Sequence, residues 1–310
     1  MKRLCCAFIF FMAMYAIEHA QQDPVFSQYM FNKMSFNPGF AGISNMVCIG
    51  LDTRQQWVGI DGAPQSTVFH ANTPFRPFGI PGGIGINLLS DNIGFDKDLA
   101  IAIAYAYHIP IGEGKLGIGF NAGLLNKALN GAQWKPPVQT EGDNAIPKDG
   151  ESAFGFDMGL GTFYETDNLF AGFSVKHLVS SKMNFDQAST QARMHYYLMA
   201  GYKMHLPNPA IEIQPSALVA SDTKNSQVTF NTNIVYNQKF WGGIAYRLGD
   251  AVIGMLGLEI FNGIRVTYSY DFSMTDLRKY NSGSHEFSVA YCFRMKVEKT
   301  PQKFKSVRFL

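Results

Sequence analysis

The sequence predicts an all-β protein: a transmembrane antiparallel β-barrel of about fourteen strands, with an N-terminal segment that packs in the lumen or at the periplasmic mouth. Three observations lead to this prediction. The chain begins with a secretory leader, apolar and polar residues alternate from about residue 45 onwards, and the connections between the alternating segments are short and long in turn.

The composition agrees with strands embedded in a membrane. Of the 310 residues, 46% are hydrophobic and 14% aromatic, whereas only 16% are charged. A soluble domain normally has about a quarter of charged residues. The net charge of +2 gives no argument for a nucleic-acid partner.

Residues 1–20 have the pattern of a signal peptide. Lys2 and Arg3 precede an apolar run from Leu4 to Ala16, which is too short to cross a bilayer as a helix. Cleavage is expected after Ala20, although Glu18 fits the usual small-residue cleavage site poorly. No later run of 18 apolar residues follows, which leaves an exported globular protein or an outer-membrane barrel.

The alternation favours the barrel. In residues 99–109, large apolar side chains occupy every second position and alanines fill most of the others. In residues 264–272, Arg265 and Asp271 alternate with apolar and aromatic residues. Because successive side chains of a strand point to opposite faces, one face can meet lipid and the other a wet lumen.

Fourteen segments show this pattern, and many have the length that a tilted strand needs to cross a bilayer. They lie near residues 46–57, 66–73, 83–90, 98–109, 115–125, 153–164, 168–179, 192–206, 210–220, 227–237, 239–248, 251–261, 264–274 and 285–295. We assign residues 45–295 to the barrel, which must be closed because hydrocarbon cannot satisfy a free strand edge.

The connections predict the orientation. If both termini are periplasmic, the even-numbered connections should be short, and most are: 110–114, 165–167, 207–209, 238 and 262–263. The odd-numbered ones include the longer segments 126–152, 180–191 and 275–284. The connections 74–82 and 249–250 fit this rule less well.

Residues 21–44 form a separate N-terminal segment, and residues 22–42 read QDPVFSQYMFNKMSFNPGFAG. This segment resembles the signature of the PorP/SprF family, outer-membrane proteins of the type IX secretion system in Bacteroidetes, whose pattern is QDPxFSQY followed by NPAYAG. Gly39 and Phe40 replace the usual Ala and Tyr. The residues that we expect to contact a partner or the barrel interior are Asp23, Pro24, Phe26, Ser27, Gln28, Tyr29, Asn37, Pro38 and Gly42.

The resemblance implies a non-enzymatic outer-membrane component of type IX secretion that docks or anchors the machinery or a cargo protein, and it implies no cofactor. The expected partners are periplasmic ring or peptidoglycan-linked proteins, a larger translocon, or a secreted cargo with a C-terminal sorting domain. Some family members function in gliding. The alternatives are an outer-membrane porin or hydrophobic-solute transporter, and a membrane enzyme.

The signature segment itself is too apolar to remain in the periplasm. Phe26, Tyr29, Phe31 and Phe36 should be buried, either inside the barrel or against a partner. Residues 37–39 read Asn-Pro-Gly, which predicts a turn that leads into the first strand.

Two cysteines, Cys48 and Cys292, fall on the first and last segments, which pair when a barrel closes. Alternation places both in the lumen. Because the sequence does not give the register of the two strands, the cysteines either form a disulfide or remain two inert thiols. Residues 296–310 form a basic tail that either binds a periplasmic partner or is a solvated end. Its basic residues are Lys296, Lys299, Lys303, Lys305 and Arg308.

Other candidate chemistry is weak. The GxGxxG match at 112–117 is followed by a strand rather than a helix, so it is expected to be a hairpin turn. The histidines have no metal-ligand spacing, and we expect neither a metal nor a catalytic site. Lumen-facing charges such as Arg54 and Asp271 either form an ion-paired network or line a selective channel.

Overall fold

The computed structural model describes residues 23–129, 150–185, 189–261 and 263–294. The expected signal peptide, the basic tail (Lys296, Lys299, Lys303, Lys305 and Arg308) and most of the connection 126–152 lie outside these ranges.

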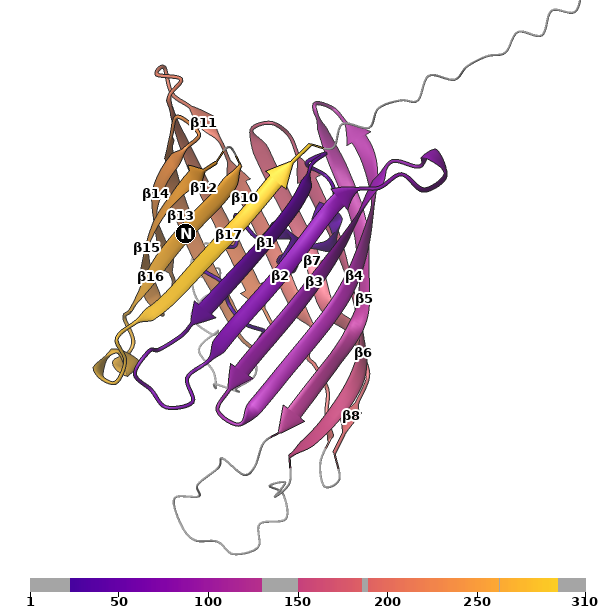
Figure 1. Cartoon of the computed structure of the whole chain (residues 1–310), viewed down its shortest axis with the longest axis vertical. Helices are drawn as coiled ribbons and strands as arrows, with labels where there is room; N and C mark the ends of the chain where they lie inside the picture. The colour runs from indigo at the N-terminus through magenta and orange to yellow at the C-terminus, as the bar shows by residue number, and fades with distance from the viewer. Residues whose placement is uncertain (1–22, 130–149, 186–188, 262, 295–310) are drawn as a thin grey trace, which may run out of the picture.

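The described chain folds into one closed antiparallel barrel (Figure 1). Its strands are β1 (Val47–Gln55), β2 (Gln65–Pro74), β3 (Gly82–Ile93), β4 (Asp96–Ile111), β5 (Gly114–Leu129), β6 (Glu151–Glu165), β7 (Leu169–Ser180), β10 (His195–Tyr202), β11 (Met204–His205), β12 (Ile211–Ser221), β13 (Ser226–Tyr236), β14 (Phe240–Arg247), β15 (Ala251–Ile260), β16 (Ile264–Ser273) and β17 (Ser284–Phe293).

Neighbouring strands in the chain are also neighbours in the wall, and two pairings complete the ring. β1 pairs with both β2 and β17, and β10 pairs with both β7 and β12. β10 and β11 are separated by Lys203 alone and both pair with β12, so they form one wall strand. The prediction of a fourteen-stranded antiparallel barrel is therefore confirmed.

The wall differs from the prediction in two details. β4 and β5 have 16 residues each and β6 has 15, so their pairing continues past the segments that alternation marked. The connection expected at 180–191 also contains a short hairpin of β8 (Met183–Asn184) and β9 (Ser189–Thr190). Neither extension has the apolar alternation of a lipid-facing strand, which is why the pattern missed them.

The two faces of the wall have the predicted chemistry. Large apolar side chains such as Ile103, Ile244 and Leu256 are exposed on the outside. The intervening positions of a strand carry polar side chains, such as Ser269 and Asp271 on β16, which are buried inside the barrel. Within the described ranges, no helix is both long and apolar enough to span a membrane.

The barrel has two distinct mouths. β1 begins and β17 ends at what we call the short-turn mouth, together with the connections 112–113, 166–168, 237–239 and 261–263. The opposite mouth carries the connections 56–64, 181–194 and 274–283. In Figure 1 the short-turn mouth is at the top, where the yellow strand β17 ends.

Cys48 and Cys292 are directly opposite each other in the β1–β17 register and form a disulfide, with Sγ atoms 2.08 Å apart. Cys48 is nearly buried, and both residues border the cavity inside the barrel. The bond lies at the seam where the first and last strands meet.

Candidate functional site

Residues 23–46 lie inside the barrel, and we call them the plug (Figure 1). Asp23 contacts His195 at the start of β10, close to the opposite mouth. Lys33 contacts Glu165 at the end of β6, and Ala41 contacts His108 near the end of β4, both close to the short-turn mouth. The plug thus runs most of the length of the lumen before β1 begins.

The middle of the plug is held in two short helical turns by its own asparagines. In α2 (Lys33–Phe36), the Asn32 side chain accepts a hydrogen bond from Ser35 N at 3.3 Å. In the 3-10 helix η1 (Pro38–Phe40), the Asn37 side chain accepts one from Gly39 N at 2.9 Å. Such side-chain caps favour these turns, and Pro at the first position loses no backbone bond there. The turn expected at Asn37-Pro38-Gly39 is therefore helical.

Asn37 also fixes the plug to the wall. Its amide nitrogen donates to Thr162 O at 2.9 Å and to Phe173 O at 3.2 Å, on β6 and β7. A buried amide that satisfies both the turn and two wall carbonyls cannot be replaced without leaving polar groups unpaired.

The apolar side chains of the plug form the core of the molecule. Phe26, Tyr29, Phe36 and Ile43 are each at most 5% exposed. They pack against wall residues that point into the lumen, namely Val68, Phe163, Tyr197, Met199 and Leu218. Phe36 meets Tyr197 edge to face, with ring centroids 5.4 Å apart. Burial of this kind stabilises by roughly 1.5–3 kcal/mol per large side chain, so the plug is part of the folded core.

A buried ionic cluster, which we call the polar clamp, holds Ser27 and Gln28. Its charged members are Arg54, Arg247, Asp271 and Glu286, all at most 2% exposed. Arg54 lies 2.7 Å from Asp271 and 3.1 Å from Glu286, and Arg247 lies 2.9 Å from Asp271. Two positive and two negative side chains balance each other, as burial of charge requires.

Ser27 lies at the centre of this clamp. Its hydroxyl lies 2.9 Å from Arg54 Nη1, 2.7 Å from Arg247 Nη2 and 2.9 Å from Asp271. The backbone N–H groups of Ser27 and Gln28 donate to the Glu286 carboxylate at 2.7 and 2.9 Å. A larger or apolar side chain at position 27 could not enter this cluster.

Asp23 is held by a second set of polar groups on β7 and β10. Its carboxylate lies 3.2 Å from Lys176 Nζ, 2.9 Å from His177 Nε2 and 3.0 Å from the Tyr197 hydroxyl. Burial alone would raise the pKa of Asp23, but the nearby charges of Lys176 and His177 hold this pKa well below its usual range. The Asp23 carboxylate therefore remains charged in the lumen.

Glycines in the wall make room for the turn of the plug. A Cβ atom at Gly119 would lie 2.5 Å from the Pro38 carbonyl oxygen, and one at Gly39 would lie 2.8 Å from the Gly117 carbonyl oxygen. Gly42 adopts a left-handed φ of 67° and donates its N–H to Asn72 at 3.2 Å. Backbone approaches backbone here more closely than any side chain would allow.

A cavity of about 700 Å³ lies between the plug and the short-turn mouth. Its lining includes the charged residues Lys33, Glu165, Lys203, Glu212, Arg265 and Arg294. Lys33 pairs with Glu165 at 3.2 Å and stands 3.9 Å from the centre of the Phe170 ring. Burial lowers the pKa of Lys33. The plug forms the floor of this cavity.

The signature residues selected from the sequence therefore meet inside the barrel. Asp23, Ser27, Gln28 and Asn37 make polar contacts with the wall, and Phe26 and Tyr29 pack in the core. Pro38 and Gly42 shape the backbone, and Pro24 borders the small cavity beside Asp23. Whether they also contact a partner stays a prediction. Lumen charges form ion pairs at Arg54 and Asp271, the first of the two arrangements that the sequence left open.

Sequence reasoning missed the wall residues that receive the plug. Arg247, Glu286, His177, His195 and Tyr197 were not selected, although alternation marks most of them as lumen-facing. Their partners in the plug are more than 150 residues away in the sequence, and local pattern carries no information on such pairs.

Comparison with known proteins agrees with this architecture. The Pseudomonas putida toluene transporter TodX is similar in fold, with a TM-score of 0.50 and 12% identity over 84% of this chain and 93% of that one. The Acinetobacter baumannii outer-membrane protein Omp33 has a TM-score of 0.45 and 8% identity over 81% of this chain and 98% of that one. At 12% identity the likeness to TodX concerns the fold alone. No curated protein matched the sequence.

The family comparison is more specific. The model of the family described as "Type IX secretion system membrane protein PorP/SprF" matches residues 18–291, which include the plug and nearly the whole barrel. The chain therefore belongs to the PorP/SprF family of type IX secretion system membrane proteins.

Proposed function

We propose that this protein is an outer-membrane docking or anchoring component of the type IX secretion system, with the short-turn mouth facing the periplasm. It would hold periplasmic ring or peptidoglycan-linked components, a larger translocon, or a secreted cargo with a C-terminal sorting domain. Family membership supports the secretion role. The observation that favours docking over conduction is the plug, whose wall contacts run along the lumen from Asp23, near the opposite mouth, to Lys33 and Ala41, at the floor of the cavity.

The dimensions of the lumen support this reading. The cavity of about 700 Å³ has the size of a small-ligand pocket and cannot hold a folded protein. Opening a path through the barrel would require breaking the polar clamp, in which buried charges such as Arg54 and Glu286 would lose their partners. A cargo protein would therefore cross the membrane through another pore.

The short-turn mouth is the surface that we assign to partners. It is polar and mixed in charge, with Lys203, Glu212 and Arg265 around the cavity, and the chain leaves β17 there towards the basic residues of the tail. Complementary charges at such a rim favour specific and rapid association.

The first experiment is a clean deletion of the gene, followed by comparison of the secreted and surface proteins with those of the parent strain. Loss of many proteins with C-terminal sorting domains would identify a core component, and loss of one would identify a cargo-specific accessory. An unchanged set of secreted proteins would contradict the proposal.

A second experiment tests the orientation and the docking surface. A photo-crosslinking residue is placed at Asp167 or Gln238 in the short turns, and at Asp250 on the opposite mouth as a matched control. Crosslinks to type IX components are expected from the first two positions and not from the third. Crosslinks from Asp250 alone would refute the assignment.

Transport of a small solute is the second candidate, because the cavity has the volume of a small-ligand site. Planar-bilayer recordings distinguish the two. Steady conductance of the purified protein would favour transport, whereas a closed barrel that conducts only after deletion of residues 23–44 would favour docking.

A further inference from the structure

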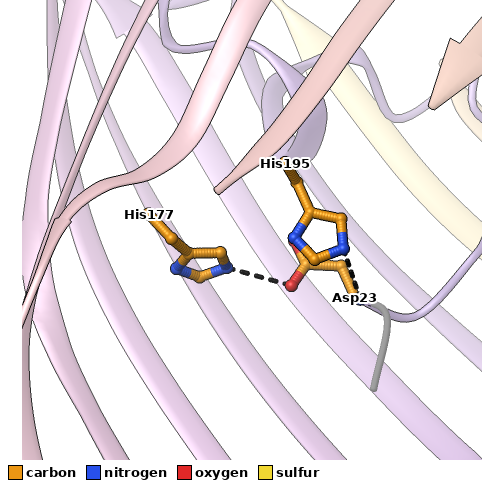
Figure 2. Close-up of side chains that lie close together, drawn as sticks. All are labelled: Asp23, His177 and His195. Atoms are coloured by element: carbon orange, nitrogen blue, oxygen red, sulfur yellow. Dashed lines mark hydrogen bonds and ion pairs between the residues drawn. The ribbon is translucent and has the colours of Figure 1, made fainter. Parts of the chain in front are cut away.

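The plug begins at a cluster of three potential metal ligands, shown in Figure 2. Asp23 comes from the plug, His177 from β7 and His195 from β10. One ligand atom of each residue lies within 4.8 Å of the others. Asp23 Oδ1 is 2.9 Å from His177 Nε2, and the Asp23 backbone nitrogen is 3.4 Å from His195 Nε2.

An irregularity in the wall brings His177 into this cluster. The β6–β7 register shifts between Met158 and Leu160, and His177 adopts a left-handed φ of 54°. In a regular strand Lys176 and His177 would point to opposite faces. The bulge turns both side chains to Asp23. Bulges and left-handed non-glycine residues concentrate at functional sites, where they re-aim a side chain.

Both imidazoles are oriented through their second nitrogen. His177 Nδ1 lies 2.8 Å from the Asp157 carboxylate, and His195 Nδ1 lies 3.0 Å from the Arg193 carbonyl oxygen. Metal-binding histidines characteristically donate one ring N–H to a carboxylate or a backbone carbonyl, which leaves the other nitrogen for the metal. Both Nε2 atoms point towards Asp23, as Figure 2 shows.

The site also has room for a further ligand. A cavity of about 20 Å³ adjoins Asp23 and His195, and it is large enough for one water molecule. Asp222 also lines this cavity. It is 3% exposed, and its Oδ2 has no hydrogen-bond partner among the described residues. A buried carboxylate oxygen beside a water-sized cavity would accept a hydrogen bond from a metal-bound water.

The charges around the cluster suit a cation. A metal ion would replace the proton between His177 Nε2 and Asp23, and in that metal-bound form Asp23, Asp157 and Asp222 contribute three negative charges against the single positive charge of Lys176. Lys176 and the Tyr197 hydroxyl both bind Asp23 Oδ2, which leaves Oδ1 for a metal.

We propose that Asp23, His177 and His195 bind one divalent transition-metal ion of the zinc class, with a water in the adjacent cavity as the fourth ligand. Two imidazole nitrogens and one carboxylate oxygen form a donor set typical of zinc. Bonds of about 2.0–2.1 Å place tetrahedral ligands roughly 3.3 Å apart. His177 Nε2 and Asp23 Oδ1 therefore need to separate by only a few tenths of an ångström. The ion would tie the start of the plug to two wall strands.

The test uses the mature full-length protein, purified in detergent with an affinity tag that contains no histidine. After equilibration with tens of micromolar zinc chloride and gel filtration, the bound metal is measured by mass spectrometry. About one zinc per chain is expected. His195→Ala and Asp23→Asn should each lower the affinity at least ten-fold, and Asp157→Asn, which removes an orienting partner, by about 10–100-fold.

The control is His205→Ala, at the other end of the barrel, where the imidazole is 58% exposed. It should bind zinc like the parent. The heat-dependent gel shift of each variant confirms that the barrel has folded, and visible absorption of the cobalt-loaded parent tests for a tetrahedral site. Failure of the parent to bind zinc, or zinc binding as tight as the parent's by the folded His195→Ala and Asp157→Asn variants, would overturn the proposal.

Discussion

Gly119→Ala tests whether the plug and the wall are packed as one unit. The new Cβ would lie 2.5 Å from the Pro38 carbonyl oxygen and 2.6 Å from Gly39 N. Ordinary contact begins near 3.4 Å, so two backbones must separate by roughly 0.9 Å. Overpacking of this kind costs about 1–3 kcal/mol. The urea midpoint of the purified barrel, followed by its heat-dependent gel shift, should fall accordingly.

Gly254→Ala is the matched control, because no atom lies within 4 Å of its added Cβ. Its effect should stay within about 0.5 kcal/mol. Both substitutions are then repeated in a barrel that lacks residues 23–44. Because Pro38 and Gly39 are then absent, the difference between the two variants should largely disappear. An equal effect of the two substitutions in the full-length protein would refute the reasoning, as would a difference that persists without the plug.

Substitutions at three further positions, Arg54, Tyr29 and Cys48, test other contacts of the plug and seam by the same urea midpoint. Arg54→Met should destabilise the barrel by about 3–5 kcal/mol, because it leaves buried Glu286 and Asp271 short of a positive partner. The control Arg265→Met, which removes the half-exposed ion pair with Glu259, should cost less than about 1 kcal/mol. Equal effects of the two substitutions would contradict the stabilising role of the polar clamp. Tyr29→Phe should cost about 0.5–1.5 kcal/mol, because its hydroxyl bonds Ser216 at 2.9 Å, whereas Tyr29→Ala should cost about 3–5 kcal/mol. Cys48→Ser should remove the migration difference between reduced and oxidised samples of the parent and cost about 2–5 kcal/mol, and a parent that migrates identically in both states would contradict the bond.

The wall was predictable from the sequence because alternation is a local signal. The segment predicted at 264–274 is β16 (Ile264–Ser273), and the face that carries Thr267 and Ser269 lies inside, as expected. Lipid outside and polar contacts inside impose this period on every strand. The pairing of the first and last strands followed from closure alone.

The interior was only partly predictable. The apolar character of Phe26 and Tyr29 indicated burial, but it left open whether the barrel or a partner covers them. Ser27 and Asp271, which meet in the polar clamp, are 244 residues apart in the sequence. Nothing in a single sequence indicates that two such distant positions are in contact. The left-handed backbone conformation of His177 was also not predictable from the sequence, because the bulge arises from the register of two strands.

The position of Ser27 has a consequence for the order of biogenesis. Its contacts on Arg54, Asp271 and Glu286 are formed by β1, β16 and β17, so the clamp is complete only when the last strands have been synthesised and paired. The contacts of Ser27 are therefore completed only together with the ring, and the Cys48–Cys292 bond can form only when β17 pairs with β1. Oxidation of that pair would then report that the barrel has closed.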